Sequence, residues 1–224
     1  MSRFLVVFDV DSTLIQDEVI ELLAEEAGKR NEVAAITDAA MRGDLDFSES
    51  LKARVATLEG LPESVIQATF DRVRLTPGAE QLIEHIHSIG GLVGAVSGGF
   101  AQILSPLAER LRLDFHLANQ LGVSDAALTG MVDGPIIDKS AKAAALKQWA
   151  EQSGVSTENT TAVGDGANDL QMMSTAGLGV AFNAKPIVRE NANLVVELAD
   201  LSELIPLFRY EKRPPTNRRP LFLI

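Results

Sequence analysis

Three short apolar runs, each ending in a polar or glycine-rich turn, restrict the possible folds of this chain most strongly. The runs comprise residues 4–8, 92–96 and 160–163. Uninterrupted apolar runs of this length are typical of β-strands that are buried on both faces of a sheet. A fourth run at residues 178–182 is expected to form a further strand. The chain is therefore predicted to have a hydrophobic sheet at its centre.

Segments with apolar residues at helical spacing lie between these runs. They comprise residues 80–89, 100–111, 141–152 and 168–176. Strands that alternate with helices predict an α/β fold with a parallel, doubly wound sheet. Ligands of such sheets bind beyond the carboxyl ends of the strands. We therefore expect the polar side chains that follow the three strands to meet at one site.

The sequence also predicts three segments outside the alternating strands and helices: a cap, a hairpin and a tail. About sixty residues, 14–75, separate the first strand from the next predicted helix, which is too long for a simple crossover connection. Their helical periodicity predicts an inserted helical cap, so that residues 1–13 and 76–208 form the core. The glycine-punctuated residues 117–137 predict a small β-hairpin excursion. The basic, proline-rich residues 209–224 predict a flexible tail.

Composition excludes several classes of protein and of site. The chain of 224 residues has no cysteine, so disulfides and thiolate metal sites are excluded, and a bound metal must rely on oxygen ligands or on three scattered histidines. Its 31 acidic and 20 basic side chains give a net charge of -11, which disfavours binding to nucleic acid. No apolar stretch is long enough to span a membrane, and no signal-peptide pattern is present. We expect a cytoplasmic protein that acts on a small molecule; the sequence does not indicate its oligomeric state.

Two carboxylates, Asp9 and Asp11, directly follow the first predicted strand. A carboxylate can attack phosphorus to form an acyl phosphate, but repulsion from the phosphate dianion opposes the attack unless a divalent cation screens it. Mg²⁺ prefers carboxylate, phosphate and water oxygens, which makes Asp9 and Asp165 its candidate side-chain ligands. Asp11 is then available as a general acid and base. The alternative is that these residues only start a turn or cap a helix.

The segments after the other strands could support this chemistry. Residues 164–169 (GDGAND) follow a strand and open a helix, although the pattern also suits an ordinary tight turn. Glycines within residues 97–99 (SGG) would let backbone N–H groups approach an anion closely. Lys142 can supply a cation, but a helical lysine is most often a solvated surface residue, and Lys139 and Lys147 are nearby alternatives.

Taken together, these segments resemble the haloacid dehalogenase (HAD) superfamily. The resemblance rests on FDVDSTL at residues 8–14, VSGGF at residues 96–100, Lys142, and VGDGAND at residues 163–169. Their order and context are similar to the phosphoserine phosphatase branch, from the first strand to about residue 206. The resemblance implies a Rossmann-like core with helices on both faces and an inserted helical cap. It also implies Mg²⁺-dependent hydrolysis of O-phospho-L-serine, the last step of serine biosynthesis, through an aspartyl-phosphate.

The resemblance implies a role for each residue of the core motifs. Asp9 would be the nucleophile and a metal ligand. Asp11 would be the acid/base and would offer its main-chain carbonyl to the metal. Asp165 would complete the side-chain ligands, and Asp169 would support the metal shell. The residues expected to hold the phosphoryl group are Ser97, Gly98, Gly99, Lys142 and Asn168.

Residues of the predicted cap resemble the substrate-binding elements of the same branch. Glu18 could pair with the ammonium group of phosphoserine and Arg54 with its carboxylate, while Met41 and Phe47 would exclude water. The alternative for a charged residue on a cap helix is an ordinary solvated position.

Three other functions remain open. A phosphotransferase could pass the phosphoryl group to another hydroxyl, such as that of homoserine, and a phosphatase for another small phosphoester would use the same core. A non-catalytic, magnesium-dependent phospholigand-binding module is a third possibility, which the paired Asp9 and Asp11 disfavour because a sensor needs no nucleophile.

Overall fold

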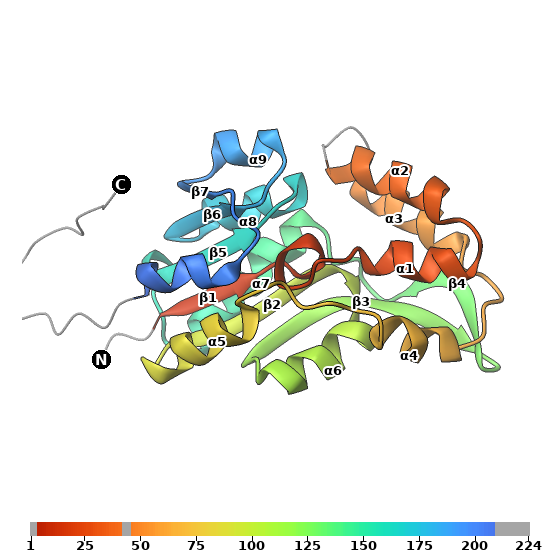
Figure 1. Cartoon of the computed structure of the whole chain (residues 1–224), viewed down its shortest axis with the longest axis horizontal. Coiled ribbons are helices and arrows are strands. Elements are labelled where there is room, and N and C mark those ends of the chain that lie inside the picture. Colours follow the sequence, from red (N-terminus) through yellow and green to blue (C-terminus); the bar gives the residue numbers. More distant parts are fainter. Residues whose placement is uncertain (1–3, 42–45, 209–224) are drawn as a thin grey trace, which may run out of the picture.

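The computed structural model describes the backbone of residues 4–41 and 46–208 and, apart from residues 40 and 41, their side chains. The predicted tail at residues 209–224 lies outside this part of the chain. The described residues form a seven-stranded sheet in the order β4-β3-β2-β1-β5-β6-β7 (Figure 1). The strands are β1 (Leu5–Phe8), β2 (Leu92–Phe100), β3 (Phe115–Ser124), β4 (Ala127–Asp133), β5 (Thr160–Gly164), β6 (Leu178–Phe182) and β7 (Leu194–Val196). All neighbouring strands are parallel except β3 and β4.

The central strand β1 is fully buried and divides the sheet into two halves. Leu5 pairs with Leu92 of β2 on one side and with Thr160 of β5 on the other, in parallel register. The strand order therefore reverses at β1, and the carboxyl ends of β1, β2 and β5 lie together. Such a reversal point is where doubly wound sheets bind ligands.

Helices cover both faces of the sheet, as predicted. Val6 and Phe8 pack into a core cluster shared with α5 (Ala79–Ser88) and α6 (Ala101–Leu111). Leu5 and Val7 point to the opposite face of the sheet. There they share a second core cluster with Trp149 of the helix at residues 139–152. The helices of that second face are α7 (Lys139–Gln152), α8 (Leu170–Thr175) and α9 (Pro186–Asn191). Alternation of side chains along a strand explains why one apolar run supplies both cores.

Residues 14–75, which we call the cap, contain helices in their described part. They are α1 (Val19–Glu26), α2 (Arg30–Met41), α3 (Phe47–Ala56) and α4 (Ser64–Phe70). Figure 1 shows these helices gathered beyond the ends of β1 and β5 and beside β4. The two connections to the rest of the chain run side by side, because Ile15 and Leu75 form an antiparallel bridge. Asp17 reinforces this bridge by accepting hydrogen bonds from Arg74, at 2.8 Å from its backbone N and at 2.6 Å from Nη2.

The predicted excursion at residues 117–137 differs in detail from the structure. Its first strand, β3, is a full member of the sheet and pairs in parallel with β2, while β4 forms the edge. The turn is at Asp125 and Ala126, which have φ values of 51° and 59°, and Gly130 lies within β4. This hairpin supports the cap, since the Gly60 N–H donates to the Leu128 carbonyl at 2.9 Å.

One expectation about the sheet is wrong. Residues 97–99 do not form a loop, because β2 continues through them to Phe100, with a register shift against β3 between Val96 and Phe100. The short strand β7 was not expected, since its three residues are too few for a clear pattern. Among the described helices, none is long and apolar enough to cross a lipid bilayer.

Candidate active site

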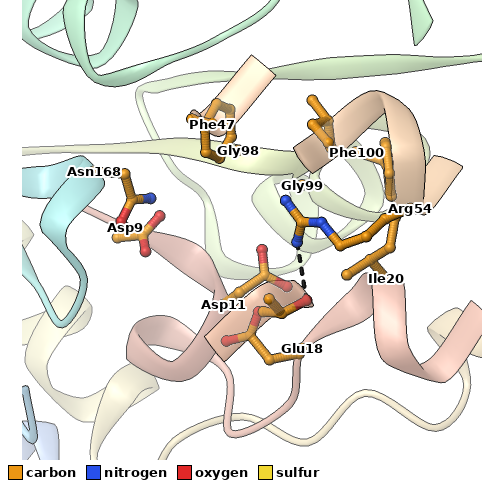
Figure 2. A pocket seen from close by; sticks show the side chains of 12 residues that line it. Asp9, Asp11, Glu18, Ile20, Phe47, Arg54, Gly98, Gly99, Phe100 and Asn168 are labelled. Atoms are coloured by element: carbon orange, nitrogen blue, oxygen red, sulfur yellow. Dashed lines mark hydrogen bonds between the residues drawn. The ribbon is translucent and has the colours of Figure 1, made fainter. Parts of the chain in front are cut away.

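Asp9 is the first residue after the central strand and is almost completely buried. Its N–H donates to the Val163 carbonyl of β5 at 2.8 Å, which continues the sheet one residue past β1. The chain then makes a tight turn over Val10–Leu14, in which Ser12 has a φ of 55°. Beyond the strand, side chains need not alternate between faces. Asp9 and Asp11 consequently line the same pocket (Figure 2).

Asp11 is held from the cap and from the core at once. Its Oδ1 accepts a hydrogen bond from the Val19 N–H at the start of α1, at 2.8 Å. Its Oδ2 accepts one from the Ser97 hydroxyl on β2, at 3.0 Å. Burial raises the pKa of Asp11 above its ordinary value, although these two hydrogen bonds oppose the shift. A carboxyl group with a raised pKa retains its proton more readily, which suits a general acid.

Lys142, rather than its two neighbours, supplies the cation of the site. Asp138 caps α7 by accepting hydrogen bonds from backbone N–H groups of the first turn, which places Lys142 on the face toward β1. The Lys142 ammonium is fully buried and lies 2.5 Å from Asp9 Oδ1 and 2.7 Å from Asp169 Oδ1. Lys139 and Lys147 are exposed. Burial alone would lower the pKa of Lys142, but the charges of Asp169 and Asp9 raise it, so the side chain is cationic.

The carboxylates of Asp9, Asp165 and Asp169 form a buried cluster in which one oxygen of each lies within 4.8 Å of the other two. Asp169 Oδ1 is bound to Lys142, and its Oδ2 accepts hydrogen bonds from the N–H groups of Asp165 and Gly166 at 3.2 and 3.1 Å. Asp165 Oδ1 is different, because it is buried without a hydrogen-bond partner in the described structure. Burial, followed by the charges of Asp9 and Asp169, raises the pKa of Asp165 well above its ordinary value.

The donors present at this cluster fit a hard cation. A buried carboxylate oxygen without a partner is costly, and a cation held between Asp9 and Asp165 would compensate it. The donors are all carboxylate oxygens, which are the ligands that Mg²⁺ prefers. Burial and the charge of Asp169 also raise the pKa of Asp9 to about 7, despite the opposing effect of Lys142. A cation beside Asp9 would lower that pKa and keep the carboxylate ionised.

A cavity of about 530 Å³, part of it open to solvent, joins these core residues to the cap. Its lining comprises Asp9, Asp11, Glu18, Ile20, Thr37, Phe47, Leu51, Arg54, Gly98, Gly99, Phe100 and Asn168 (Figure 2). Asp165, Ser97 and Lys142 lie behind this lining and are buried. The structure thus brings together the predicted core residues and three of the four predicted cap residues. The fourth, Met41, is the last residue of α2, and its side chain lies outside the described part of the chain.

Glu18 and Arg54 bring opposite charges to the cap side of the cavity. Glu18 Oε1 accepts a hydrogen bond from the Ser12 hydroxyl at 2.6 Å. Burial, followed by the charges of Asp11 and Asp165, raises the pKa of Glu18 well above its ordinary value. Burial lowers the pKa of Arg54, and the charge of Glu18 opposes that shift. In the described part of the chain neither Glu18 nor Arg54 forms a salt bridge, so both can address a ligand in the cavity.

Several residues that support the site were not predicted. Ile20, Thr37 and Phe100 also line the cavity, and each reads in the sequence as an ordinary position on an apolar or amphipathic segment. Asn119 on β3 is buried, and its amide donates to the Gly98 carbonyl at 2.8 Å. Its own carbonyl oxygen accepts from the Ile137 N–H at 2.8 Å. Asn119 thereby connects the Gly98 segment to the chain that leads into α7, a link between distant residues that leaves no local sequence signal.

A family model described as haloacid dehalogenase-like hydrolase matches residues 6–174. Among curated proteins, phosphoserine phosphatase SerB2 of Mycobacterium tuberculosis is 57% identical over 192 residues, which cover 86% of this chain and 47% of that protein. The phosphoserine phosphatase of Streptococcus thermophilus is 50% identical over 203 residues, which cover 91% and 94% of the two chains. The chain spans about half the length of the Mycobacterium tuberculosis relative and of the Streptomyces coelicolor relative.

Solved structures resemble the fold over most of this chain. One described as a phospho-aspartyl intermediate analogue of phosphoserine phosphatase has a TM-score of 0.91 and 42% identity, and covers 93% of this chain and 100% of its own. A substrate-bound phosphoserine phosphatase complex also has a TM-score of 0.91, with 41% identity and the same coverage. The sequence motifs, the geometry of the site and these matches lead to one conclusion. The chain belongs to the haloacid dehalogenase-like hydrolase family and, within it, to the phosphoserine phosphatases.

Proposed function

We propose that this protein is a magnesium-dependent phosphatase that hydrolyses O-phospho-L-serine to L-serine and phosphate through a covalent phosphate on Asp9. The observation that carries the proposal is the position of Asp9, which lines the cavity, contacts the Lys142 ammonium and shares a carboxylate cluster with Asp165. The two curated relatives described above are both named phosphoserine phosphatase and are similar in sequence over most of this chain, which supports the same reaction. That reaction is the last step of serine biosynthesis.

In the first step, an oxygen of Asp9 attacks the phosphorus atom while the bond from phosphorus to the serine oxygen breaks. Asp11 donates its proton to the leaving serine oxygen. In the second step, Asp11 removes a proton from water, the water oxygen bonds to phosphorus, and the bond between phosphorus and Asp9 breaks. The two steps consume one water and restore both carboxyl groups.

The remaining core residues hold the transferred group. In our proposal, Lys142, the Ser97 hydroxyl, the Gly98 N–H and the Asn168 amide bind phosphoryl oxygens, and Gly99 allows the segment to approach them closely. A Mg²⁺ ion held by Asp9, Asp165 and the Asp11 carbonyl would screen the repulsion between Asp9 and the phosphate. Asp169 positions Lys142 and the backbone next to Asp165. The cap excludes bulk water, so that the phosphorylated Asp9 reacts only with the water that Asp11 positions.

Recognition of serine rests on the two charges of the cap. Glu18 pairs with the substrate ammonium and Arg54 with its carboxylate. Phe47 and Met41 are proposed to exclude water above them. The raised pKa of Glu18 supports this proposal, because a substrate cation would offset the burial and the charges of Asp11 and Asp165 that raise it.

Release of phosphate from O-phosphoserine, with Mg²⁺ present or chelated, tests the proposal. Asp9→Asn should reduce the rate to background, because an amide cannot form the covalent intermediate. Asp125→Asn, in the exposed β3–β4 turn, is the matched control and should keep wild-type activity. Equal rates in wild type and Asp9→Asn would contradict the proposed role of Asp9 as the nucleophile. Faster turnover of another small phosphoester would show that O-phosphoserine is not the substrate. Transfer to added homoserine in preference to water would show that the enzyme is a phosphotransferase.

A further inference from the structure

Arg54 is held in the cavity by two hydrogen bonds that fix the plane of its guanidinium group. Its Nε donates to the Ser50 carbonyl on the same helix, α3, at 3.1 Å. Its Nη1 donates to the Thr37 hydroxyl at 3.0 Å, across the interface between α3 and α2. Figure 2 marks one hydrogen bond, which runs from Arg54 to this hydroxyl. Thr37 is buried and lines the same cavity.

The orientation of the Thr37 hydroxyl is itself determined. A threonine hydroxyl has one proton to donate and can accept in addition. Thr37 donates that proton to the Val33 carbonyl, one helical turn earlier, at 3.0 Å. Its oxygen is therefore left with acceptor capacity only, and that capacity is directed at Arg54. Two of the five N–H groups of Arg54 are engaged by described residues, so three remain for a carboxylate in the cavity.

Electrostatics explains why such a restraint is needed. The charges of Glu18, Asp11 and Glu21 all act on Arg54, with Glu18 the strongest of them. Nevertheless, Arg54 forms no salt bridge with any carboxylate of the described residues. An unrestrained arginine side chain would move toward the nearest acidic group, which would neutralise both partners before substrate arrives. The hydrogen bond from Arg54 to Thr37 opposes that collapse.

We propose that Thr37 is a positioning residue that orients Arg54 toward the substrate carboxylate and so makes the enzyme selective for phosphorylated amino acids over phosphorylated amines. This inference rests on the proposed function and deepens it. Thr37 does not touch the reacting atoms. Its effect should therefore appear in the affinity for substrates that carry a carboxylate, and the chemical steps at Asp9 should be unaffected.

The test compares O-phosphoserine with O-phosphoethanolamine, which has the same phosphate and ammonium groups but lacks the carboxylate. Thr37→Val keeps the shape of the side chain and removes the hydroxyl. Hydrogen bonds to charged groups are among the stronger ones in proteins, so we expect the KM for O-phosphoserine to rise about tenfold. The kcat should stay within about twofold, and kcat/KM for O-phosphoethanolamine should not change. Thr37→Ser retains the hydroxyl and should restore the wild-type KM.

Thr175→Val provides the matched control. Thr175 also donates its hydroxyl to a carbonyl one turn earlier, that of Gln171 at 2.8 Å, but it lies on α8 and outside the cavity lining. Its KM for O-phosphoserine should equal that of wild type. Thermal unfolding of each variant identifies any general loss of structure, and the Thr37→Ser variant separates loss of the hydroxyl from a packing effect.

The outcomes distinguish this inference from the proposed function. If wild type prefers O-phosphoserine and Thr37→Val has an unchanged KM, or loses both substrates equally, the role of Thr37 is refuted and the proposed function stands. If wild type hydrolyses O-phosphoethanolamine as well as O-phosphoserine, the proposed substrate is wrong, and the role of Thr37 is refuted with it.

Discussion

The ring of Phe47 covers Gly98 so closely that a Cβ atom on Gly98 would lie 2.6 Å from Cζ of the ring. Phe47 begins α3 of the cap, whereas Gly98 lies in β2 of the core. This contact closes one side of the cavity, and both residues line it. A Cβ atom at this position would require the ring to move, since real Cβ contacts are almost never so short.

Gly98→Ala should therefore displace Phe47 and weaken cap closure. Overpacking of a close contact typically costs about 1–3 kcal/mol, so we expect kcat/KM for O-phosphoserine to fall about ten- to a hundredfold. Steady-state phosphate release measures the effect. The double variant Gly98→Ala/Phe47→Leu should recover part of the activity, because the smaller side chain leaves room for the methyl group. No recovery would show that the added methyl acts on something other than the ring.

Lys142→Met should abolish activity and destabilise the fold, because it leaves Asp9 and Asp169 buried without their shared cation. Breaking a buried ion pair by removal of one partner costs about 3–5 kcal/mol. Urea unfolding without Mg²⁺ measures the free energy of unfolding. Lys147→Met, on the exposed side of the same helix, is the control and should change that free energy by no more than about 0.5 kcal/mol. Similar losses in the two variants would contradict the assigned role of Lys142.

The buried carboxylate of Asp165 predicts opposite effects of Asp165→Asn with and without metal. In a chelator, the variant should be at least as stable as wild type, since a neutral amide avoids the desolvation and repulsion that raise the pKa of Asp165. Saturating Mg²⁺ should raise the Tm of wild type by mass action and should have much less effect on the variant. Thermal unfolding under both conditions gives the comparison. The proposed metal site would be excluded by an identical rise in Tm for wild type and Asp165→Asn.

The ion pair between Lys185 and Asp38 connects the cap to the core at 3.2 Å. Lys185 follows β6, and its N–H donates to the Asp165 carbonyl at 3.0 Å, while Asp38 belongs to α2. Exposed ion pairs contribute up to about 1 kcal/mol, so Lys185→Glu should reduce kcat/KM by no more than about fivefold. The charge-swapped double variant Asp38→Lys/Lys185→Glu should regain activity, and high salt should reduce the differences. A double variant no better than Lys185→Glu would exclude a contribution of this pair to closure.

The strands that are buried on both faces were predicted correctly from the sequence. The segments whose extended conformation depends on neighbouring parts of the fold were not. The segments that became β1, β5 and β6 contain no charged residue, because both faces of each strand are covered. The polar and glycine residues that end the apolar part of β2 suggested a loop, but the strand continues through them to Phe100, past a register shift against β3. The three-residue β7 has too little sequence to show any period.

The sequence by itself determined that Asp9 and Asp165 meet, since each follows an apolar strand and the carboxyl ends of parallel strands share one edge of a sheet. Only the tertiary structure decided which lysine joins Asp9 to Asp169 and how Arg54 is restrained. Lys142 bonds to Asp9 across 133 positions of the chain, and Arg54 bonds to Thr37 on another helix. Such contacts depend on how whole helices rotate and pack against each other, and a local pattern of residue types does not determine that packing.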